Sequence, residues 1–199
     1  MSTHPIERES YRILRTRLDL GGWEPGPRAV IERVIHASAD LSYADTMVVP
    51  SAAVAAGVAA VAGGAPVVVD VGMVGAGITA LRTSCFLDEA EPDGEMTRSA
   101  AAMRLAAERH PDGAVFVVGC APTALSAIVE LATAGLLRPA LVIGLPVGFV
   151  GAAEAKELLR RSALPAISNT GERGGSAVAA AAFNALVRLA GAAPGAPPP

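Results

Sequence analysis

The chain has 199 residues, of which 52% are hydrophobic, and a formal net charge of −3 at pH 7. This length suits one domain with a full hydrophobic core, and the small negative charge excludes a basic surface for nucleic-acid phosphates. Cys85 and Cys120 form no C-x-x-C pair and the charged N-terminal segment is not typical of a signal peptide, so we expect a cytoplasmic protein without disulfides.

The N-terminal third of the chain is predicted to be mainly helical. Apolar residues recur at helical spacing among many charges over Pro5–Leu18, which predicts an amphipathic surface helix. A Gly- and Pro-rich loop is expected over Gly21–Pro27 and a second helix over Arg28–Ala37, with His36 near its end. Ser51 is then expected to cap a helix that runs to about Ala62.

The segment from Thr46 to Val69 carries no charge and is long enough to span a bilayer. Its apolar residues are mostly Ala and Val, and Pro and Gly residues interrupt it. We therefore predict a buried helix followed by a buried strand here, rather than a membrane span.

Short β-branched runs alternate with helical segments through the rest of the chain. This alternation predicts one three-layer α/β domain over residues 1–190, with a mostly parallel sheet of about five strands flanked by helices. The tail over residues 191–199 is rich in Pro and Gly and is expected to be disordered. The predicted strands are Val67–Val71, Thr83–Leu87, Ala114–Gly119, Ala140–Gly144 and Pro165–Ser168, and the predicted helices between them are Thr97–Arg109, Thr123–Ala134, Ala152–Arg161 and Gly175–Leu189.

Common cofactor motifs are missing or incomplete. The sequence has neither G-x-x-x-x-G-K-[ST] nor G-x-S-x-G, and its histidines and cysteines do not have metal-ligand spacing, so we expect no metal site. The run Gly75-Ala-Gly77-Ile-Thr-Ala80 resembles a dinucleotide turn after a strand. Only about seven residues separate Gly77 from the next apolar run, which is too short for the crossover helix that such a site needs.

Three glycine-containing loops lie between a predicted strand and a predicted helix. They begin at Gly119, Gly144 and Gly171, and the third contains Arg173. Free backbone N–H groups and the helix dipole favour anions at such positions, and ligands bind beyond the carboxyl ends of parallel strands. Each loop alone could be an ordinary turn, but three at one edge favour a polyanionic ligand.

Three further side chains are open to more than one interpretation. His36 could complement the end of its helix or act in catalysis. Arg98 lies in the first turn of a predicted helix, where a cation opposes the dipole, so it could bind a ligand carboxylate or be merely solvated. Asp70 follows a buried strand and could cap a turn or hold a ligand group.

Taken together, these segments resemble the precorrin-8X methylmutase family, also called cobalt-precorrin-8 methylmutases. The resemblance extends over about residues 5–190, and the order of its motifs is highly specific. The matching stretches are Ser10-Tyr11, Arg33-Val-Ile-His-Ala37, Asp70-Val-Gly-Met-Val with Gly77-Ile78, Thr97-Arg98, Gly119 with Ala121-Pro-Thr-Ala-Leu125, Pro146-Val-Gly-Phe-Val-Gly-Ala-Ala-Glu154 with Lys156, and Gly174-Gly-Ser-Ala-Val.

The resemblance implies an isomerase of cobalamin biosynthesis that moves a methyl group from C-11 to C-12 of the corrin ring. It implies no cofactor, a homodimer, and precorrin-8X or cobalt-precorrin-8 as substrate. His36 matches the family's histidine, which is thought to protonate a ring nitrogen, a role that suits a group with a pKa near neutral. The substrate-binding residues that it suggests are Ser10, Asp70, Arg98, Thr123, Gly148, Arg173, Gly174, Gly175 and Ser176.

Two positions depart from the family pattern. Cys120 stands where the family usually has Asn, and Glu172 stands where it often has a basic residue. Cys120 lacks the amide's donor and acceptor, and a carboxylate at position 172 would repel an anionic substrate unless it points away. The alternative to an isomerase is therefore a tetrapyrrole-binding or carrier protein without turnover.

Overall fold

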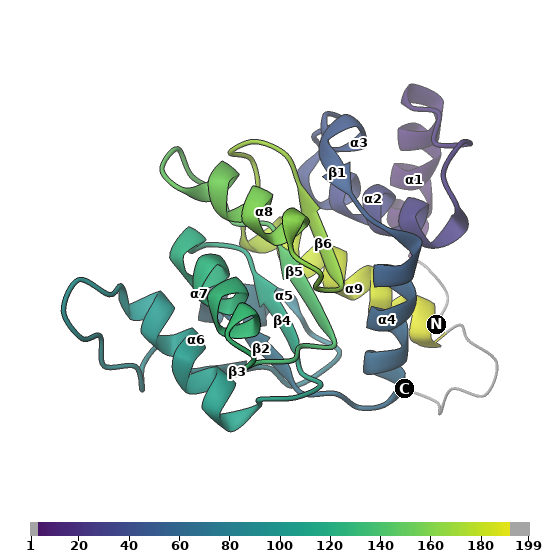
Figure 1. Cartoon of the computed structure of the whole chain (residues 1–199). Helices are drawn as coiled ribbons and strands as arrows, with labels where there is room; N and C mark the ends of the chain where they lie inside the picture. The colour runs from purple at the N-terminus through teal and green to yellow at the C-terminus, as the bar shows by residue number, and fades with distance from the viewer. Residues whose placement is uncertain (1–3, 192–199) are drawn as a thin grey trace.

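The computed structural model of the chain describes residues 4–191. In this part of the chain, one sheet is flanked by helices (Figure 1). The strands are β1 (Met47–Val48), β2 (Val67–Val69), β3 (Ser84–Cys85), β4 (Val115–Val118), β5 (Leu141–Gly144) and β6 (Ala166–Asn169). The helices are α1 (Pro5–Arg17), α2 (Pro25–Ser38), α3 (Tyr43–Thr46), α4 (Ser51–Ala62), α5 (Gly72–Gly77), α6 (Arg98–Arg109), α7 (Pro122–Thr133), α8 (Ala152–Arg161) and α9 (Ser176–Gly191).

The α/β fold class is confirmed, and the described sheet has six strands in the order β1-β6-β5-β4-β2-β3. All neighbours pair in parallel except β1, which pairs antiparallel with β6. The prediction of about five strands missed β1, an edge strand of two residues. Since β4, β5 and β6 are parallel neighbours, their carboxyl ends lie together at one edge of the sheet.

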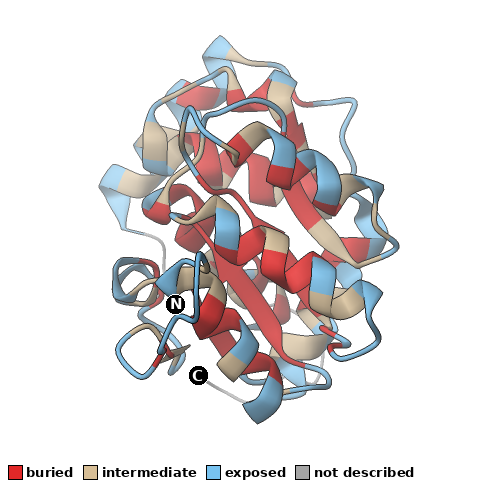
Figure 2. Ribbon diagram, turned by 60° about the vertical axis from the view of Figure 1, so that its left-hand side comes forward, coloured by how far each residue is buried: buried red, intermediate tan, exposed pale blue. Residues whose placement is uncertain are grey.

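The strands are buried on both faces, which explains their continuous β-branched sequences. Alternate residues of β4 point to opposite sides: Val115 and Val117 pack with α2, α4 and α9, whereas Phe116 and Val118 pack with α6, α7 and α8. Figure 2 shows this arrangement as buried strands and buried inner helix faces under an exposed outer surface. The sheet is therefore a rigid base for the loops that leave its carboxyl edge.

Helices α1 and α2 form the outermost layer on the face of the sheet that α9 covers. Helix α1 buries only Leu14 and packs on α2, which in turn packs on α9. The loop predicted over residues 21–27 ends earlier than expected, because α2 begins at Pro25, where a missing N–H costs no helical hydrogen bond.

The uncharged segment contains β1, α4 and β2, and β2 is buried as predicted. The prediction of a buried helix was wrong, because α4 buries only Ala53, Val54 and Gly57 and leaves its other face at the surface. Ser51 is the first residue of α4 and does not cap it; its hydroxyl instead donates to Glu24 Oε2 at 2.7 Å. Among the described residues, no helix has both the length and the apolar content needed to cross a bilayer.

The glycines of the incomplete dinucleotide motif belong to the short helix α5, between β2 and β3. A Cβ on Gly77 would lie 2.7 Å from the Cβ of Ala180 in α9, so this glycine allows α5 to approach α9 closely. Gly75 and Gly77 thus lie within and at the end of a helix, and not at the start of a crossover helix as dinucleotide binding requires.

The predicted tail is almost entirely untested. Gly191 is the last residue of α9, and residues 192–199 lie outside the described part of the chain.

Candidate functional site

The three predicted anion loops do meet at the carboxyl edge of the sheet. They follow β4, β5 and β6 and lead into α7, α8 and α9. Backbone hydrogen bonds join the second and third loops, from Gly148 N to Glu172 O at 3.1 Å and from Gly175 N to Leu145 O at 2.9 Å. The prediction of one common edge is confirmed, and the second and third loops contact each other directly.

Asp70 shapes the first of these loops. Its side chain is fully buried, and its two carboxylate oxygens accept hydrogen bonds from the backbone N–H groups of Gly119, Cys120 and Ala121 at 2.8–3.1 Å. Burial raises the pKa of Asp70, and these three donors act against that effect. Of the two interpretations of Asp70, the structure supports the turn cap.

Gly174 lies where two loops pack backbone against backbone. A Cβ at this position would lie 2.2 Å from the carbonyl oxygen of Leu145 and 2.5 Å from that of Pro146. Gly175 follows with φ at +130° and precedes Ser176, the buried first residue of α9. The glycine pair therefore holds the start of α9 against the loop after β5.

Arg173 does not extend freely into solvent. Its guanidinium donates hydrogen bonds to Asp40 and to Ser42 Oγ, just beyond the end of α2. The Arg173 carbonyl oxygen accepts from Lys156 Nζ at 2.7 Å and from Asn169 Nδ2 at 2.9 Å. Arg173 thus connects the carboxyl edge of the sheet with the helix that carries His36.

Thr123 and Arg98 lie together where α6 and α7 begin. The hydroxyls of Thr123 and Thr97 are 2.7 Å apart, and Thr97 caps α6 by accepting from Ala100 N. Arg98 is exposed, and no described residue forms a hydrogen bond or ion pair with it. Its charge is available to a ligand at this edge.

His36 is held from α1 by two neighbouring residues. Ser10 Oγ lies 2.7 Å from His36 Nδ1, and the Tyr11 ring stacks on the imidazole with centroids 5.0 Å apart and planes inclined by 15°. Two sequence stretches that are 26 residues apart are thereby joined. The arrangement fixes the ring orientation and leaves Nε2 as the nitrogen not engaged by Ser10.

Charged side chains surround His36 on the side of α1 and α9. Burial, together with the positive charges of Arg33 and Arg188, lowers the pKa of His36, and Glu7 acts in the opposite direction. Glu7 Oε1 accepts from both arginines, at 2.9 Å from Arg33 and 2.7 Å from Arg188. In the free protein His36 therefore binds a proton less readily than an ordinary imidazole.

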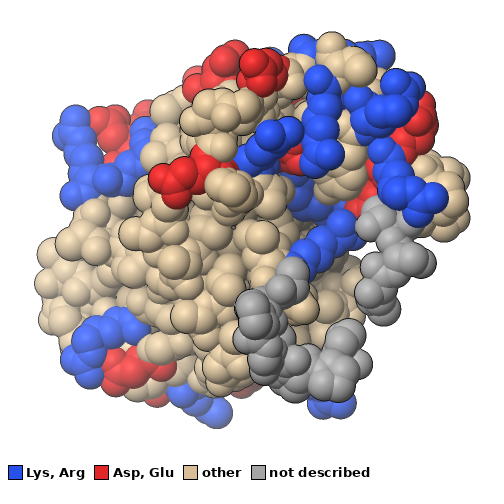
Figure 3. All heavy atoms as spheres, turned by 90° about the vertical axis from the view of Figure 1, so that its right-hand side faces the viewer, with Lys and Arg blue, Asp and Glu red and all other residues tan. Residues whose placement is uncertain are grey.

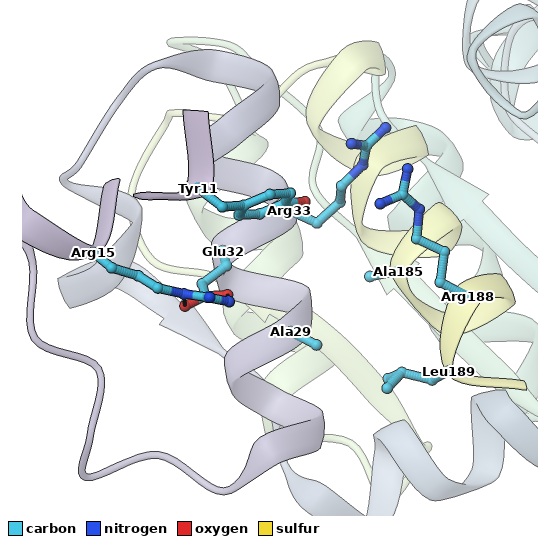
Figure 4. Close-up of a pocket in the computed structure, with 8 residues that line it drawn as sticks. All are labelled: Tyr11, Arg15, Ala29, Glu32, Arg33, Ala185, Arg188 and Leu189. Atoms are coloured by element: carbon cyan, nitrogen blue, oxygen red, sulfur yellow. Dashed lines mark hydrogen bonds and ion pairs between the residues drawn. The ribbon is translucent and has the colours of Figure 1, made fainter. Parts of the chain in front are cut away.

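A pocket of about 190 Å³ opens beside this cluster, between α1, α2 and α9 (Figure 4). The guanidinium groups of Arg33 and Arg188 lie near one another at one end of it, while Arg15 pairs with Glu32 at 2.7 Å. Among the described residues, Arg33 Nε is a buried donor without a hydrogen-bond partner. The cluster therefore keeps an excess of positive charge and an unused donor.

Arg33 and Lys156 were not predicted to be functional residues, although both lie in stretches that match the family. Arg33 precedes His36 by three residues, which places it on the same side of α2. Lys156 interrupts an otherwise apolar face of α8, and burial lowers its pKa to about 8. A lysine on a buried helix face was the available sign of a special role.

The two departures from the family pattern act through their backbones in this structure. Cys120 is exposed, and its N–H binds Asp70. Glu172 is also exposed, and its carbonyl accepts from Gly148 N. In the described residues, no group of three or more His, Cys, Asp or Glu side chains could hold a metal ion.

Comparison with known proteins gives one consistent answer. Residues 5–189 match the family model for precorrin-8X methylmutase. The chain is 42% identical to the precorrin-8X methylmutase of Pseudomonas aeruginosa, covering 91% of this chain and 93% of that protein. It is 40% identical to the cobalt-precorrin-8 methylmutase of Methanocaldococcus jannaschii, covering 93% of both chains. A solved structure of precorrin-8X methylmutase from Thermus thermophilus superposes with a TM-score of 0.85 and 39% identity, covering 94% of this chain and 98% of that one.

Proposed function

The chain belongs to the precorrin-8X methylmutase family of isomerases in cobalamin biosynthesis, and on that premise we propose that it moves a methyl group from C-11 to C-12 of a corrinoid substrate. The bond from the methyl group to C-11 breaks as the bond to C-12 forms, so substrate and product have the same mass. The observation that carries the proposal is the contact between Ser10 and His36, which joins two of the matching motifs in one site.

We propose that His36 protonates a ring nitrogen. Burial, together with the charges of Arg33 and Arg188, lowers the pKa of His36 in the free protein, so the imidazole holds a proton less readily before substrate binds. A substrate carboxylate near these arginines would offset their positive charge and raise the pKa of His36. Binding would thus bring a proton to the imidazole, and Ser10 Oγ would accept a hydrogen bond from the protonated Nδ1.

The pocket beside Arg33 and Arg188 suits one arm of the substrate. Its volume of about 190 Å³ is smaller than the roughly 300–1,000 Å³ of pockets for drug-sized ligands, so it is too small for the macrocycle. An acetate or propionate arm would fit, and its carboxylate could accept from the unused Nε of Arg33. We propose that this arm anchors the ring next to His36.

The remaining carboxylates of the substrate would lie along the carboxyl edge of the sheet. Arg98 offers a charge there that no described residue neutralises, and Arg173 offers a charge shared with Asp40. We propose that these arginines bind substrate together with hydroxyl and backbone groups of the same edge, namely Thr123, Gly148, Gly174, Gly175 and Ser176, and that Ser10 of α1 binds it beside His36.

The direct test incubates purified protein with precorrin-8X and, separately, with cobalt-precorrin-8, without any added cofactor. We expect the absorbance spectrum to change while the mass of the corrinoid stays constant. His36→Ala should lower the rate by about 10²–10⁴-fold, the usual contribution of a general acid, and His110→Ala on the other face of the sheet is the matched control. Binding without conversion would favour a carrier protein, and a strict need for NAD(P)H would exclude the isomerase.

We further propose that the protein is a homodimer. The face in Figure 3 has a broad area without Lys, Arg, Asp or Glu, and α4, whose 12 residues carry no charge, lies on this side of the molecule. A second copy would cover such an area, and two-fold dimers are the commonest assemblies. Light scattering at micromolar protein should give twice the chain mass; a monomer mass would contradict this proposal.

A cytoplasmic location also remains a prediction. It is supported by Cys85 and Cys120, which are both free thiols in the structure. Alkylation of both residues in freshly lysed cells without reductant would test it.

A further inference from the structure

Lys156 is the one lysine of this chain, and its side chain is fully buried. Helix α8 is amphipathic, and Lys156 lies on its inner face with Ala152, Ala155 and Leu159. The ammonium donates to Asn169 Oδ1 at 3.0 Å and to the carbonyl oxygen of Arg173 at 2.7 Å. Lys156 therefore reaches from α8 to the turn that follows β6.

This turn is fixed at several points of its backbone. Asn169, itself fully buried, donates from Nδ2 to the Arg173 carbonyl at 2.9 Å and to the Thr170 carbonyl at 3.2 Å. The carbonyl of Glu172 accepts from Gly148 N at 3.1 Å. The Arg173 carbonyl thus receives two side-chain donors from inside the protein, and Lys156 is one of them.

The side chain of Arg173 extends from this fixed carbonyl towards α2. It binds Asp40 and Ser42, and Asp40 lies four residues beyond His36. Arg173 therefore links Lys156, which binds its backbone carbonyl, to Asp40, which binds its guanidinium, and Asp40 lies just beyond the helix that carries His36.

Stability alone does not account for a lysine at this place. In the described part of the chain, no carboxylate lies in ion-pair contact with Lys156, and both groups that it binds are neutral. The charges that influence it are Arg160, which disfavours the ammonium, and Glu172, which favours it. Burying a charge without a counter-ion is costly, and a methionine would fill this space without that cost.

We propose that Lys156 is a positioning residue of the substrate site, whose ammonium holds the Arg173 carbonyl so that the arginine meets Asp40 at the end of the His36 helix. The expected effect of Lys156 on turnover rests on the proposed function, whereas its expected effect on the backbone of the turn after β6 does not. Lys156 contacts no substrate in this role and acts through Arg173.

The first test measures the rate at which trypsin cleaves the turn after β6, in the absence of substrate. Trypsin cleaves after arginine, and the bond after Arg173 contains the carbonyl that Lys156 holds. In Lys156→Met, which lacks the donor, we expect cleavage after Arg173 to become about tenfold faster. Lys156→Gln, which keeps a neutral donor, should show a smaller increase.

Cleavage after Arg161, an exposed residue at the end of α8, is the internal control and should not change. If both sites become faster together, Lys156 serves general stability and the proposal is wrong. Unchanged cleavage after Arg173 in Lys156→Met also overturns it.

The second test uses turnover. Lys156→Met should raise KM about tenfold with kcat within threefold, and in an Arg173→Ala background the same substitution should change KM less than twofold. Equal effects in both backgrounds would show that Lys156 does not act through Arg173. If the wild-type protein fails to convert the corrinoid, the proposed function fails, while the trypsin result still decides the role of Lys156 in the turn.

Discussion

The contact between Ser10 and His36 allows a quantitative prediction for Ser10→Ala. Ser10 Oγ lies 2.7 Å from His36 Nδ1. When His36 is protonated, Nδ1 carries a proton and donates it to Ser10 Oγ as a charged hydrogen bond; when His36 is neutral, the same contact is a neutral hydrogen bond whose donor depends on the tautomer. A hydrogen bond to a charged group contributes ~1.5–3 kcal/mol and a neutral one ~0.5–1.5 kcal/mol. The contact therefore favours the protonated form by about 1 kcal/mol, which corresponds to about 0.7 pKa units.

Removing the hydroxyl should lower the pKa of His36 by about 0.7 units, further below its usual value of 6.5. The protonated fraction at pH 7 then falls about fivefold, and kcat/KM should fall by the same factor. The loss should become smaller as the pH is lowered below the pKa, because both proteins then carry the proton.

The assay is an NMR titration of the histidine side chains, with His36→Ala used to assign the signal and with pH profiles of kcat/KM measured in parallel. Thr16→Ala is the matched control. It also removes a hydroxyl from α1, but this hydroxyl donates to the Ile13 carbonyl and not to His36. A His36 pKa that differs by less than 0.2 units in Ser10→Ala, or a loss of activity that is the same at every pH, would refute the reasoning.

Three further outcomes are expected. Asp70→Ala should lower the free energy of unfolding by about 3 kcal/mol or more in denaturant titrations, because three backbone N–H groups lose their acceptor. Gly174→Ala should raise KM at least tenfold, since its Cβ would overlap two backbone carbonyls, whereas Gly22→Ala, which meets no atom within 4 Å, should match wild type. Lys156 has a pKa of about 8 in the folded protein and about 10.4 in the unfolded chain. Between these values the unfolded chain binds more protons, so the free energy of unfolding rises with pH. Relative to Lys156→Met, the free energy of unfolding of the wild type should increase by about 2 kcal/mol from pH 7 to pH 9.5.

The architecture could be predicted from the sequence because it depends on local patterns. Continuous β-branched runs such as Val115–Val118 indicate strands buried on both faces, and the α8 boundaries agree with the prediction at both ends. Prediction missed two short elements, β1 and α5, and failed at Ser51, whose hydroxyl binds Glu24, the residue before α2.

The sequence by itself determined the layered α/β fold, the glycine loops at the strand ends and the motif that contains His36. Only the tertiary structure decided what each polar side chain binds: Asp70 holds the turn at residues 119–121, Arg173 meets Asp40, and Ser10 meets His36. The physical reason is the range of the interactions. Helix and strand periods arise from neighbours a few residues apart, whereas these partners lie 26 to 133 residues apart and meet only because the sheet brings its loops and the outer helices together.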